Sequence, residues 1–274
     1  MMGMRKILFD MDKKIAVIGG NGYLGYHVAK YFKADSLSRA NGFDVTEKGL
    51  GKKLSGYDVI IHMAAKVDKS GKNDMEVFRV NADGTRNIVE SLNKNQTLIF
   101  ASTKEVYTPI NNQDSYGLSK IIAENYINYF SKVNGFKSGI FRLATTYAPA
   151  TNGSTFVNYF VDCVKNNKKL LLMMKGEQTR DFLYVDDLSN AFEKFIYSDK
   201  KKGMWDIGGG KENSENFATF LNDVGKVVGV SPVIGFSDEV VAGNPHHITD
   251  IEKIGKDLGW APKVGILEGI AKII

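Results

Sequence analysis

Tyr116 and Lys120 are two side chains whose types and spacing could transfer a proton. A spacing of four residues puts the phenol and the ammonium on the same face of a helix. A free tyrosine has a pKa of about 10 and is a poor base at neutral pH, and a neighbouring lysine cation lowers the pKa of the phenol. The same spacing occurs at Tyr26 and Tyr197, but only Tyr116 follows a strand-like run that ends in hydroxyl residues, at positions 102–103. The pattern therefore selects Tyr116 as the candidate proton-transfer group.

A second chemical signal lies near the start of the chain, where the apolar run Ile15–Ile18 leads into glycines at 19, 20, 22 and 25. The first or second glycine would permit a tight turn, Gly22 would let the backbone approach a pyrophosphate, and Gly25 would let the following helix pack closely on the strand. The pyrophosphate would then lie at the helix N-terminus, where free N–H groups and the helix dipole favour anions. A protein-kinase phosphate loop has a similar spelling, but no V-A-I-K, H-R-D or D-F-G element follows it. We therefore expect a dinucleotide to bind here.

The composition is that of an ordinary globular chain, with 274 residues, 43% of them hydrophobic, and a formal net charge of +5. The lysines are scattered rather than gathered with aromatic residues, so we expect no nucleic acid as a partner. The chain has no apolar run of about 18 residues and no apolar segment behind its basic N-terminus, so we expect neither a membrane span nor a signal peptide. The single Cys163 allows no internal disulfide, should be a buried small hydrophobe, and suits the reducing cytoplasm. We expect no metal site.

Strand-like runs alternate with helix-like segments along most of the chain. The helix-period segments at 75–93 and 116–133 each lie between two such runs, and the second has one apolar stripe. This alternation implies parallel strands joined by right-handed crossovers, hence an α/β fold with a doubly wound parallel sheet of the Rossmann type. Ligands of such sheets bind at the carboxyl ends of the strands, so the chemistry should gather there. The expected strands are Ile15–Ile18, Val59–His62, Thr97–Ala101, Ser138–Leu143 and Met204–Ile207.

After about residue 145 the pattern changes to loops and mixed helical segments. Ser214 could cap the N-terminus of a helix that carries its apolar residues on one face. We expect a smaller, discontinuous C-terminal lobe that binds the substrate and covers the edge of the sheet. The predicted division is a dinucleotide-binding domain at 1–145 and 185–205 and a substrate-binding lobe at 146–184 and 206–274.

Further motifs follow the glycine loop in a fixed order along nearly the whole chain. With them the chain resembles the extended short-chain dehydrogenase/reductase superfamily, and within it the NAD-dependent epimerase/dehydratase family, which modifies nucleotide sugars. The motif around Arg180 separates this branch from short reductases that lack a substrate lobe. The motifs are His62-Met-Ala-Ala65, Val80-Asn-Ala-Asp-Gly-Thr85, Ser102-Thr103-Lys-Glu105-Val-Tyr107, Tyr116-x-x-x-Lys120, Arg142-Leu-Ala-Thr-Thr-Tyr-Ala-Pro149, Thr179-Arg-Asp-Phe-Leu-Tyr-Val-Asp-Asp-Leu188 and Leu258-Gly-Trp-Ala-Pro-Lys263.

The resemblance implies a role for each candidate in the reaction. Thr103 would hydrogen-bond the reacting sugar hydroxyl or carbonyl, and Tyr116 would exchange its proton. Lys120 would also hold the nicotinamide ribose, and Asn81, on the substrate side, would brace the site rather than take part in the chemistry. The positions assigned to the cofactor are Gly19, Gly22, Tyr23, Leu24, Gly25, Asp35, Ser38, Arg39, Asp44, Ala64, Ala65 and Lys120.

Arg180 is the residue that the resemblance assigns to the substrate diphosphate. A guanidinium fork is well shaped for such a group, because it can donate two parallel hydrogen bonds. The alternative is a structural ion pair within its own motif, to Asp186 or Asp187.

Glu105 bears on which reaction the site performs. In decarboxylases and 4,6-dehydratases of the family, an acidic residue two positions after the active-site threonine takes part in chemistry beyond C4, which makes Glu105 a candidate catalytic residue. A purely structural Glu105 is the other interpretation. This chain has Lys104 where dehydratases have Asp, which weakens the dehydratase alternative. Thr145 stands where an Asn is usual and Ala148 where a Gly is usual, so the sugar pocket departs from the family pattern.

The cofactor choice depends on the end of the second strand. A helix of about 18 Å after the glycine loop, followed by a strand of about five residues, puts the strand end near Ser38 and Arg39 and leaves Asp35 near its start. An Arg at the strand end suits the 2′-phosphate of NADP, whereas an Asp there suits NAD. A competing alignment reads 35–38 as the Asp-x-Leu-Ser of NAD-using epimerases but needs an unusually short first helix. We predict an NAD(P) cofactor, with NADP favoured, and Asp44 beside the adenine.

The leading prediction is an NAD(P)-dependent enzyme that transfers hydride at C4 of a nucleotide-linked hexose, as an epimerase or as a 4-ketoreductase. Two alternatives stay open, a nucleotide-sugar dehydratase or decarboxylase that uses Glu105, and a non-catalytic dinucleotide-sensing protein on the same fold. The intact set of Thr103, Tyr116 and Lys120 argues against the sensor, which has no need of a poised phenol. The resemblance also suggests a homodimer that forms through the helix of Tyr116.

Overall fold

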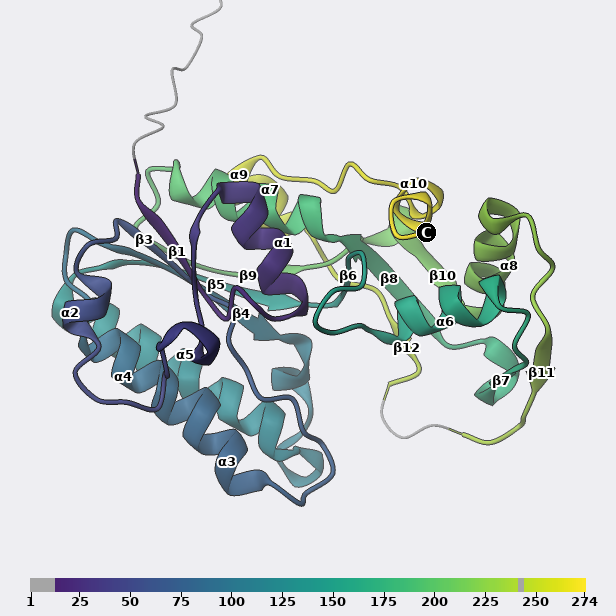
Figure 1. Ribbon diagram of the computed structural model, residues 1–274, viewed down its shortest axis with the longest axis horizontal. Helices are drawn as coiled ribbons and strands as arrows, with labels where there is room; N and C mark the ends of the chain where they lie inside the picture. The colour runs from purple at the N-terminus through teal and green to yellow at the C-terminus, as the bar shows by residue number, and fades with distance from the viewer. Residues whose placement is uncertain (1–12, 241–243) are drawn as a thin grey trace, which may run out of the picture.

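A six-stranded parallel sheet forms the centre of the computed structural model, which describes residues 13–240 and 244–274 (Figure 1). The strand order is β2-β1-β3-β4-β5-β9, so the sheet is doubly wound, and the predicted fold class is confirmed. The N-terminal segment in which we expect no signal peptide lies outside the described residues. The strands are β1 (Ile15–Ile18), β2 (Asp35–Leu37), β3 (Val59–His62), β4 (Thr97–Thr103), β5 (Lys137–Leu143) and β9 (Lys202–Ile207).

Helices cover both faces of this sheet, because successive residues of a strand point to opposite sides. Along β3, Val59 and Ile61 pack into one buried apolar cluster, and Ile60 packs into the other. The first cluster takes residues from α1 (Tyr23–Phe32) and α7 (Val185–Ile196). The second takes residues from α2 (Gly51–Leu54), α4 (Gly84–Glu90) and α5 (Ser115–Asn134).

The helix expected over 75–93 is interrupted near its middle. The chain forms α3 (Asp74–Phe78), then a π-helical turn over Arg79–Asp83, and then α4, which ends at Glu90. A π turn inserts one extra residue, so the residues after it face a different direction from those of a continuous α-helix. The apolar periodicity predicts the helix but does not reveal the turn that widens it.

A second, smaller sheet lies beyond the carboxyl ends of the large sheet, to its right in Figure 1. Its strands are β10 (Ser214–Asn216), β8 (Thr179–Tyr184) and β12 (His246–His247), and β6 (Thr145–Tyr147) also pairs with β8. Around it lie α6 (Phe156–Lys165), α8 (Phe217–Val228), α10 (Ile266–Ala271) and the strand pair β7 (Leu170–Leu172) and β11 (Ile234–Phe236), while α9 (Glu252–Leu258) contacts β9.

Ser214 does not cap the helix that follows it. It begins β10, which pairs antiparallel with β8, and the cap of α8 is Asn216, whose Oδ1 accepts a hydrogen bond from Thr219 N at 2.8 Å. The strand pairing thus moves the start of the helix to Phe217. Cys163 is free and buried in α6. The division of the chain into two domains stays a prediction.

Among the described residues, no helix is both long enough and apolar enough to cross a membrane.

Candidate active site

Glycines shape the turn between β1 and α1. Gly19 has a φ of +85°, in the left-handed region that favours glycine, so Gly19 makes the tight turn. A Cβ on Gly19 would lie 2.6 Å from Ala64 N, and a Cβ on Gly25 would overlap Gly19 O. The loop backbone therefore packs directly on α1 and on the residues after β3. The first amide groups of α1 have no intrahelical acceptor, which suits them to bind an anion.

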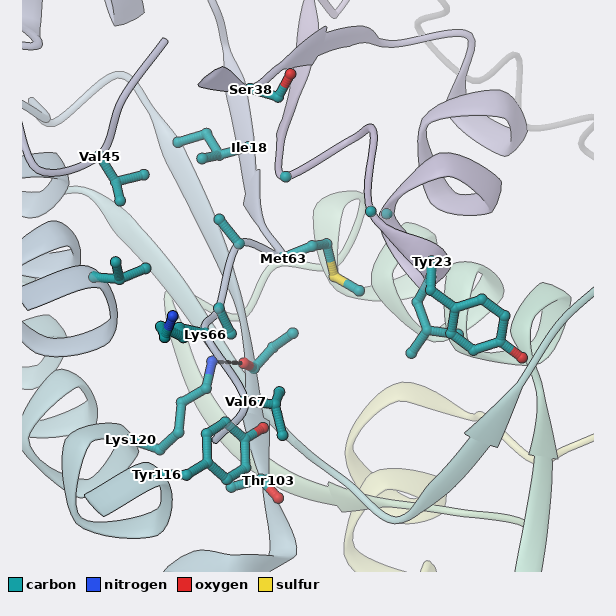
Figure 2. Close-up of a pocket in the computed structure, with 18 of the residues that line it drawn as sticks. Ile18, Tyr23, Ser38, Val45, Met63, Lys66, Val67, Thr103, Tyr116 and Lys120 are labelled. Carbon is teal, nitrogen blue, oxygen red and sulfur yellow. Dashed lines mark hydrogen bonds between the residues drawn. The ribbon is translucent and has the colours of Figure 1, made fainter. Parts of the chain in front are cut away.

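A cavity of about 600 Å³ extends from this glycine loop to the carboxyl end of β4 (Figure 2). It joins the glycine loop to Thr103, Tyr116 and Lys120, which are far away in the sequence. At one end of this long cavity the glycine loop leaves space that the Cβ of any other residue would fill. Such an arrangement fits a dinucleotide. The predicted cofactor positions that line the cavity are Gly19, Gly22, Tyr23, Leu24, Gly25, Ser38, Arg39, Asp44, Ala64, Ala65 and Lys120.

The structure places Asp35 away from this cavity, in contrast to its expected role at the cofactor. Asp35 begins β2 opposite Ala16, and its Oδ2 accepts a hydrogen bond from Tyr57 Oη at 2.9 Å. Ligands of a parallel sheet bind at the carboxyl ends of the strands, and Asp35 lies at the opposite end of β2. Of the two residues weighed for the cofactor choice, only Arg39 lines the cavity.

Arg79 lines the cavity although the sequence analysis did not select it. The hydrogen bond from Thr46 N, at 2.9 Å, is the main cause that lowers the pKa of Asp44, and the charges of Arg39 and Arg79 lower it further. Two guanidinium groups therefore lie near one carboxylate at this end of the cavity. The periodicity of an α-helix could not identify Arg79 as a cavity residue, because Arg79 is the first residue of the π turn.

Thr103, Tyr116 and Lys120 meet at the other end of the cavity (Figure 2). Thr103 ends β4, and the other two lie in the first turns of α5. Asp114 fixes the start of that helix, since its Oδ1 accepts a hydrogen bond from Gly117 N at 2.7 Å. The hydroxyl groups of Thr103 and Tyr116 lie near each other, and the Thr103 side chain lowers the pKa of Tyr116. A carbonyl or hydroxyl oxygen of a substrate placed beside them could contact both.

Burial controls the protonation of this pair. It raises the pKa of Tyr116 to about 12, against the lowering effect of the Thr103 side chain. Burial also lowers the pKa of Lys120 to about 7, and its Nζ donates to Ala101 O at 2.8 Å. Burial is therefore the largest influence on the pKa of Tyr116, and it favours the neutral form of the phenol. Tyr116 is a neutral phenol at neutral pH, the form that can give a proton.

Asn81, in the π turn, braces the site and does not line the cavity. Its Nδ2 donates to Lys66 O at 2.9 Å and to Ser119 Oγ at 3.0 Å, and its Oδ1 accepts from Lys66 N at 2.8 Å. Ser119 Oγ in turn donates to Tyr116 O at 2.7 Å. Asn81 thus connects the loop after β3 to the helix that carries Tyr116.

Glu105 lies outside the cavity lining but close to its catalytic end. Its charge contributes to the raised pKa of Tyr116, after the larger effect of burial. Its Oε1 forms an ion pair with Lys69 Nζ at 3.1 Å, and its backbone N donates to Thr103 Oγ1 at 3.3 Å. Glu105 is therefore near the reacting groups, with its carboxylate engaged by a lysine.

Arg180 is held by backbone oxygens. Its Nη1 donates to Thr179 O at 2.8 Å and to Pro245 O at 2.7 Å, and burial lowers its pKa. Asp187, one of the two possible ion-pair partners, instead accepts hydrogen bonds from Lys263 N and Val264 N, both at 2.9 Å. These contacts fix the guanidinium in place without neutralising its charge.

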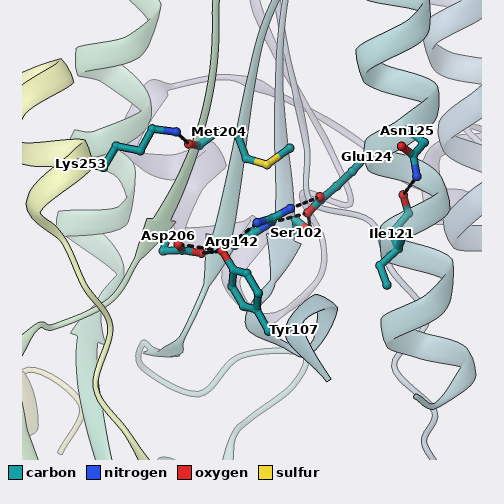
Figure 3. A network of polar contacts seen from close by, with 9 residues as sticks. All are labelled: Ser102, Tyr107, Ile121, Glu124, Asn125, Arg142, Met204, Asp206 and Lys253. Carbon is teal, nitrogen blue, oxygen red and sulfur yellow. Dashed lines mark hydrogen bonds and ion pairs between the residues drawn. The ribbon is translucent and has the colours of Figure 1, made fainter. Parts of the chain in front are cut away.

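A polar network that the sequence analysis did not identify fixes α5 against the sheet (Figure 3). Arg142 Nε and Nη2 donate to the two carboxylate oxygens of Glu124 at 3.0 and 2.6 Å, and Ser102 Oγ donates to the same carboxylate at 2.6 Å. Arg142 also donates to Tyr107 Oη at 2.7 Å, and Tyr107 donates to Asp206 at 2.8 Å. No spacing in the sequence identifies this network, because its members come from elements that are far apart along the chain.

Comparison with known proteins identifies a family. Residues 15–208 match the model of the NAD dependent epimerase/dehydratase family. A Methanocaldococcus jannaschii protein named "Putative UDP-glucose 4-epimerase" is 28% identical over 95% of this chain and 97% of its own.

Two solved structures share the fold of this chain. One is a Bacillus cereus UDP-glucuronic acid 4-epimerase in complex with UDP-glucuronic acid and NAD, with a TM-score of 0.80 and 21% identity. The other is RMD from Pseudomonas aeruginosa complexed with NADPH, with a TM-score of 0.83 and 18% identity. Each alignment covers 95% of this chain and 97% of the other. With its doubly wound sheet and the match over most of its length, the chain belongs to the NAD-dependent epimerase/dehydratase family, whose members are enzymes of the extended short-chain dehydrogenase/reductase type.

Proposed function

We propose that this enzyme transfers hydride between an NAD(P) cofactor and C4 of a nucleotide-linked hexose, as a 4-ketoreductase or as a 4-epimerase. One observation carries the proposal. The glycine loop and the hydroxyl groups of Thr103 and Tyr116 line the same cavity. A dinucleotide bound at the loop would bring its nicotinamide toward the end of β4, beside a phenol that can move a proton.

The residues of this chain would hold and protonate the substrate. Tyr116 would exchange a proton with the C4 oxygen, and Thr103 would hydrogen-bond the same oxygen. Lys120 would hold the nicotinamide ribose, and Arg180, already fixed by backbone oxygens, would receive the diphosphate. The bound cofactor supplies or accepts the hydride.

The protonated form of Tyr116 fits the carbonyl-reduction step that a 4-ketoreductase and a 4-epimerase share. A phenol whose pKa is raised to about 12 by burial holds its proton at neutral pH and can give it to a carbonyl oxygen as hydride arrives. The 4-epimerase is the second candidate, because a relative that covers 95% of this chain carries that name. Glu105 is paired with Lys69, which argues against a dehydratase or decarboxylase role for its carboxylate.

An assay of cofactor oxidation tests this function. We expect loss of the absorbance of NADPH or NADH when the protein is mixed with a 4-keto nucleotide sugar. An epimerase would instead convert a 4-hydroxy nucleotide sugar with no net cofactor oxidation and would purify with dinucleotide bound. If neither activity is found with uridine- and thymidine-linked hexoses, the proposal is wrong.

The cavity end near β2 supports NADP over NAD. Arg39 and Arg79 both line it, and the carboxylate of Asp35 accepts a hydrogen bond from Tyr57 instead. We predict that Arg39→Ala weakens NADPH binding at least about tenfold, because a charged hydrogen bond contributes roughly 1.5–3 kcal/mol, and leaves NADH binding unchanged. Titration of each dinucleotide by fluorescence measures this. Asp35→Ala is the matched control and should change neither affinity, and an unchanged NADPH affinity in Arg39→Ala would contradict the assignment.

We also propose that two copies of this chain form a homodimer through α5. Tyr129 and Val133 of α5 support it, since both are apolar and are 63% and 60% exposed.

A further inference from the structure

Lys69 lies in the loop after β3, close to the catalytic end of the cavity. Val67, two residues earlier, lines the cavity and lies beside Tyr116 in Figure 2. Lys69 itself does not line the cavity, and its side chain is 47% exposed. Any effect of Lys69 on the reaction would therefore act through other residues.

Two carboxylates flank the residues that would carry out the chemistry, and Lys69 contacts both. Glu105 follows Thr103 by two positions along the chain. Asp114 precedes Tyr116 by two positions. Lys69 Nζ lies 3.1 Å from Glu105 Oε1 and 4.0 Å from Asp114 Oδ2. One ammonium thus joins the loop after β3, the turn after β4 and the start of α5.

Hydrogen bonds to the backbone hold these segments in place without the lysine. Glu105 N donates to Thr103 Oγ1 at 3.3 Å, and Glu105 O accepts from Gln113 Nε2 at 3.0 Å. Asp114 Oδ1 accepts from Gly117 N at 2.7 Å, which leaves its Oδ2 to face the ammonium. What the lysine adds to this junction is therefore positive charge.

The negative charges of Glu105 and Asp114 oppose the chemistry proposed for Tyr116. Burial raises the pKa of the phenol most, and both carboxylates raise it further. As the phenol gives its proton, negative charge develops on its oxygen, and a nearby carboxylate without a counterion repels that charge. A cation that balances the two carboxylates therefore favours the proton transfer.

Two other cations near Glu105 do not replace this ion pair. The charge of Glu105 raises the pKa of Lys104 and of Arg180, against the larger effect of burial, so both lie in its neighbourhood. In the part of the chain that the structure describes, however, the Glu105 carboxylate forms its ion pair with Lys69 and with neither of these two. The charge balance at Glu105 therefore depends mainly on Lys69.

We propose that Lys69 is a positioning residue for the reaction, which holds the carboxylates of Glu105 and Asp114 and balances their charge beside Tyr116. The inference rests on the proposed function, since it assumes that Tyr116 gives a proton in the cavity. Loss of the ammonium should disfavour negative charge at the phenol oxygen and favour positive charge on a nearby ligand. The oxidised nicotinamide ring carries a positive charge, and the reduced ring carries none.

Single-turnover kinetics and dinucleotide titration of Lys69→Met test both consequences. We expect the rate with a 4-keto nucleotide sugar to fall about two- to fivefold, the size of effect that an exposed ion pair has. The ratio of the Kd of NADPH to the Kd of NADP⁺ should rise by about the same factor, because the oxidised form gains affinity relative to the reduced form. A role in folding alone would weaken both forms equally. Lys69→Arg keeps the charge and should restore both values.

The Glu105→Gln background shows whether Lys69 acts through that carboxylate. With the carboxylate removed, most of the effect of Lys69→Met on the rate and on the ratio of affinities should disappear. A smaller part should remain, since the contact of Lys69 with Asp114 is the longer one. The control is Lys72→Met, which removes the same charge from an exposed position of the same loop and should change neither value.

An effect of Lys69→Met that is as large in the Glu105→Gln background as in the wild type would overturn the inference. An unchanged ratio of dinucleotide affinities in Lys69→Met would overturn it as well. In both cases the proposed function stands. If the wild type binds dinucleotide but converts no nucleotide sugar, the proposed function is wrong, and the ratio of affinities still decides the role of Lys69. A wild type that binds no dinucleotide would refute both.

Discussion

The oxygen of Tyr116 is the atom around which the candidate site is arranged. It faces the hydroxyl of Thr103 inside the cofactor cavity, and burial keeps it protonated. Lys120, one helical turn away, is buried as well and contacts Ala101 O and the ring of Phe100. A neutral phenol and a lysine whose pKa is about 7 can together give and regain a proton near neutral pH.

We predict that Tyr116→Phe lowers kcat by about 10²–10⁴-fold, the usual contribution of a positioned acid or base, and leaves the dinucleotide Kd unchanged. The change removes one oxygen and keeps the ring, so packing is preserved. Steady-state kinetics and dinucleotide titration measure the two effects. Tyr26→Phe, at an exposed position of α1 that also has a lysine four residues later, is the matched control. Activity close to that of the wild type would remove Tyr116 from its assigned role.

At the scale of single residues, the sequence predicts which side chains form the site better than it predicts their protonation states. The order of motifs was sufficient to select Thr103, Tyr116 and Lys120, and the structure brings them together. The strand estimated from the sequence also has Asp35 near its start, as in the structure, and so away from the carboxyl end where a cofactor would bind. The raised pKa of Tyr116 depends on burial by segments distant in the sequence, which no local pattern contains.

At the scale of elements, the segment from β3 to α5 holds the catalytic residues in place. The π turn at Arg79–Asp83 presents Asn81 to the loop after β3 and to Ser119 of α5. The apolar strands and helices that surround it follow from the sequence, because their periodicity reflects burial. The π turn does not follow from the sequence, because side-chain contacts to elements that are distant in the sequence stabilise it.

His62 connects three of these elements. It ends β3, its Nε2 lies 3.1 Å from Thr85 Oγ1 of α4, and its ring packs against Phe100 of β4. Burial, aided by the charge of Lys120, lowers its pKa to about 3. The folded protein therefore binds this proton less readily than the unfolded chain, in which a histidine has a pKa of about 6.5. The stability that depends on neutral His62 is complete above about pH 6.5 and is lost as the pH falls toward 3.

We predict that protonation of His62 lowers the free energy of unfolding by about 3 kcal/mol at about pH 4 relative to about pH 7. His62→Asn removes the titrating group, so the difference in stability between wild type and variant should shrink by that amount between the two pH values. Urea unfolding at both pH values measures it. A difference for His62→Asn that stays constant with pH would contradict the assignment.

For the whole molecule, the relation between the two sheets decides where the site forms. The small sheet lies beyond the carboxyl ends of the large one, so Arg180 of β8 and His247 of β12 approach the end of β4, near Lys104. The sequence predicted a second lobe after about residue 145 but not its strand pairing, because β6, β8, β10 and β12 are short and pair over long sequence separations. The approach of Arg180 to the end of β4 is a product of that pairing.

Asp187 connects the C-terminal segment to α7. Its Oδ2 accepts hydrogen bonds from Lys263 N and Val264 N, both at 2.9 Å, and its backbone O accepts one from Trp260 Nε1 at 3.0 Å. The side chain is 4% exposed, so its loss would leave two amide groups without an acceptor in a place that water reaches poorly. Each unsatisfied amide costs about 1–3 kcal/mol.

We therefore predict that Asp187→Ala lowers the unfolding free energy by about 2–6 kcal/mol, measured by urea denaturation. Its neighbour Asp186 supplies the matched control, since it has the same charge and lies in the same first turn of α7 but is exposed. Asp186→Ala should cost less than about 1 kcal/mol, the usual effect of one carboxylate on the helix dipole. Equal effects of the two substitutions would mean that charge at the start of α7, and not the connection to the C-terminal segment, accounts for the stabilisation.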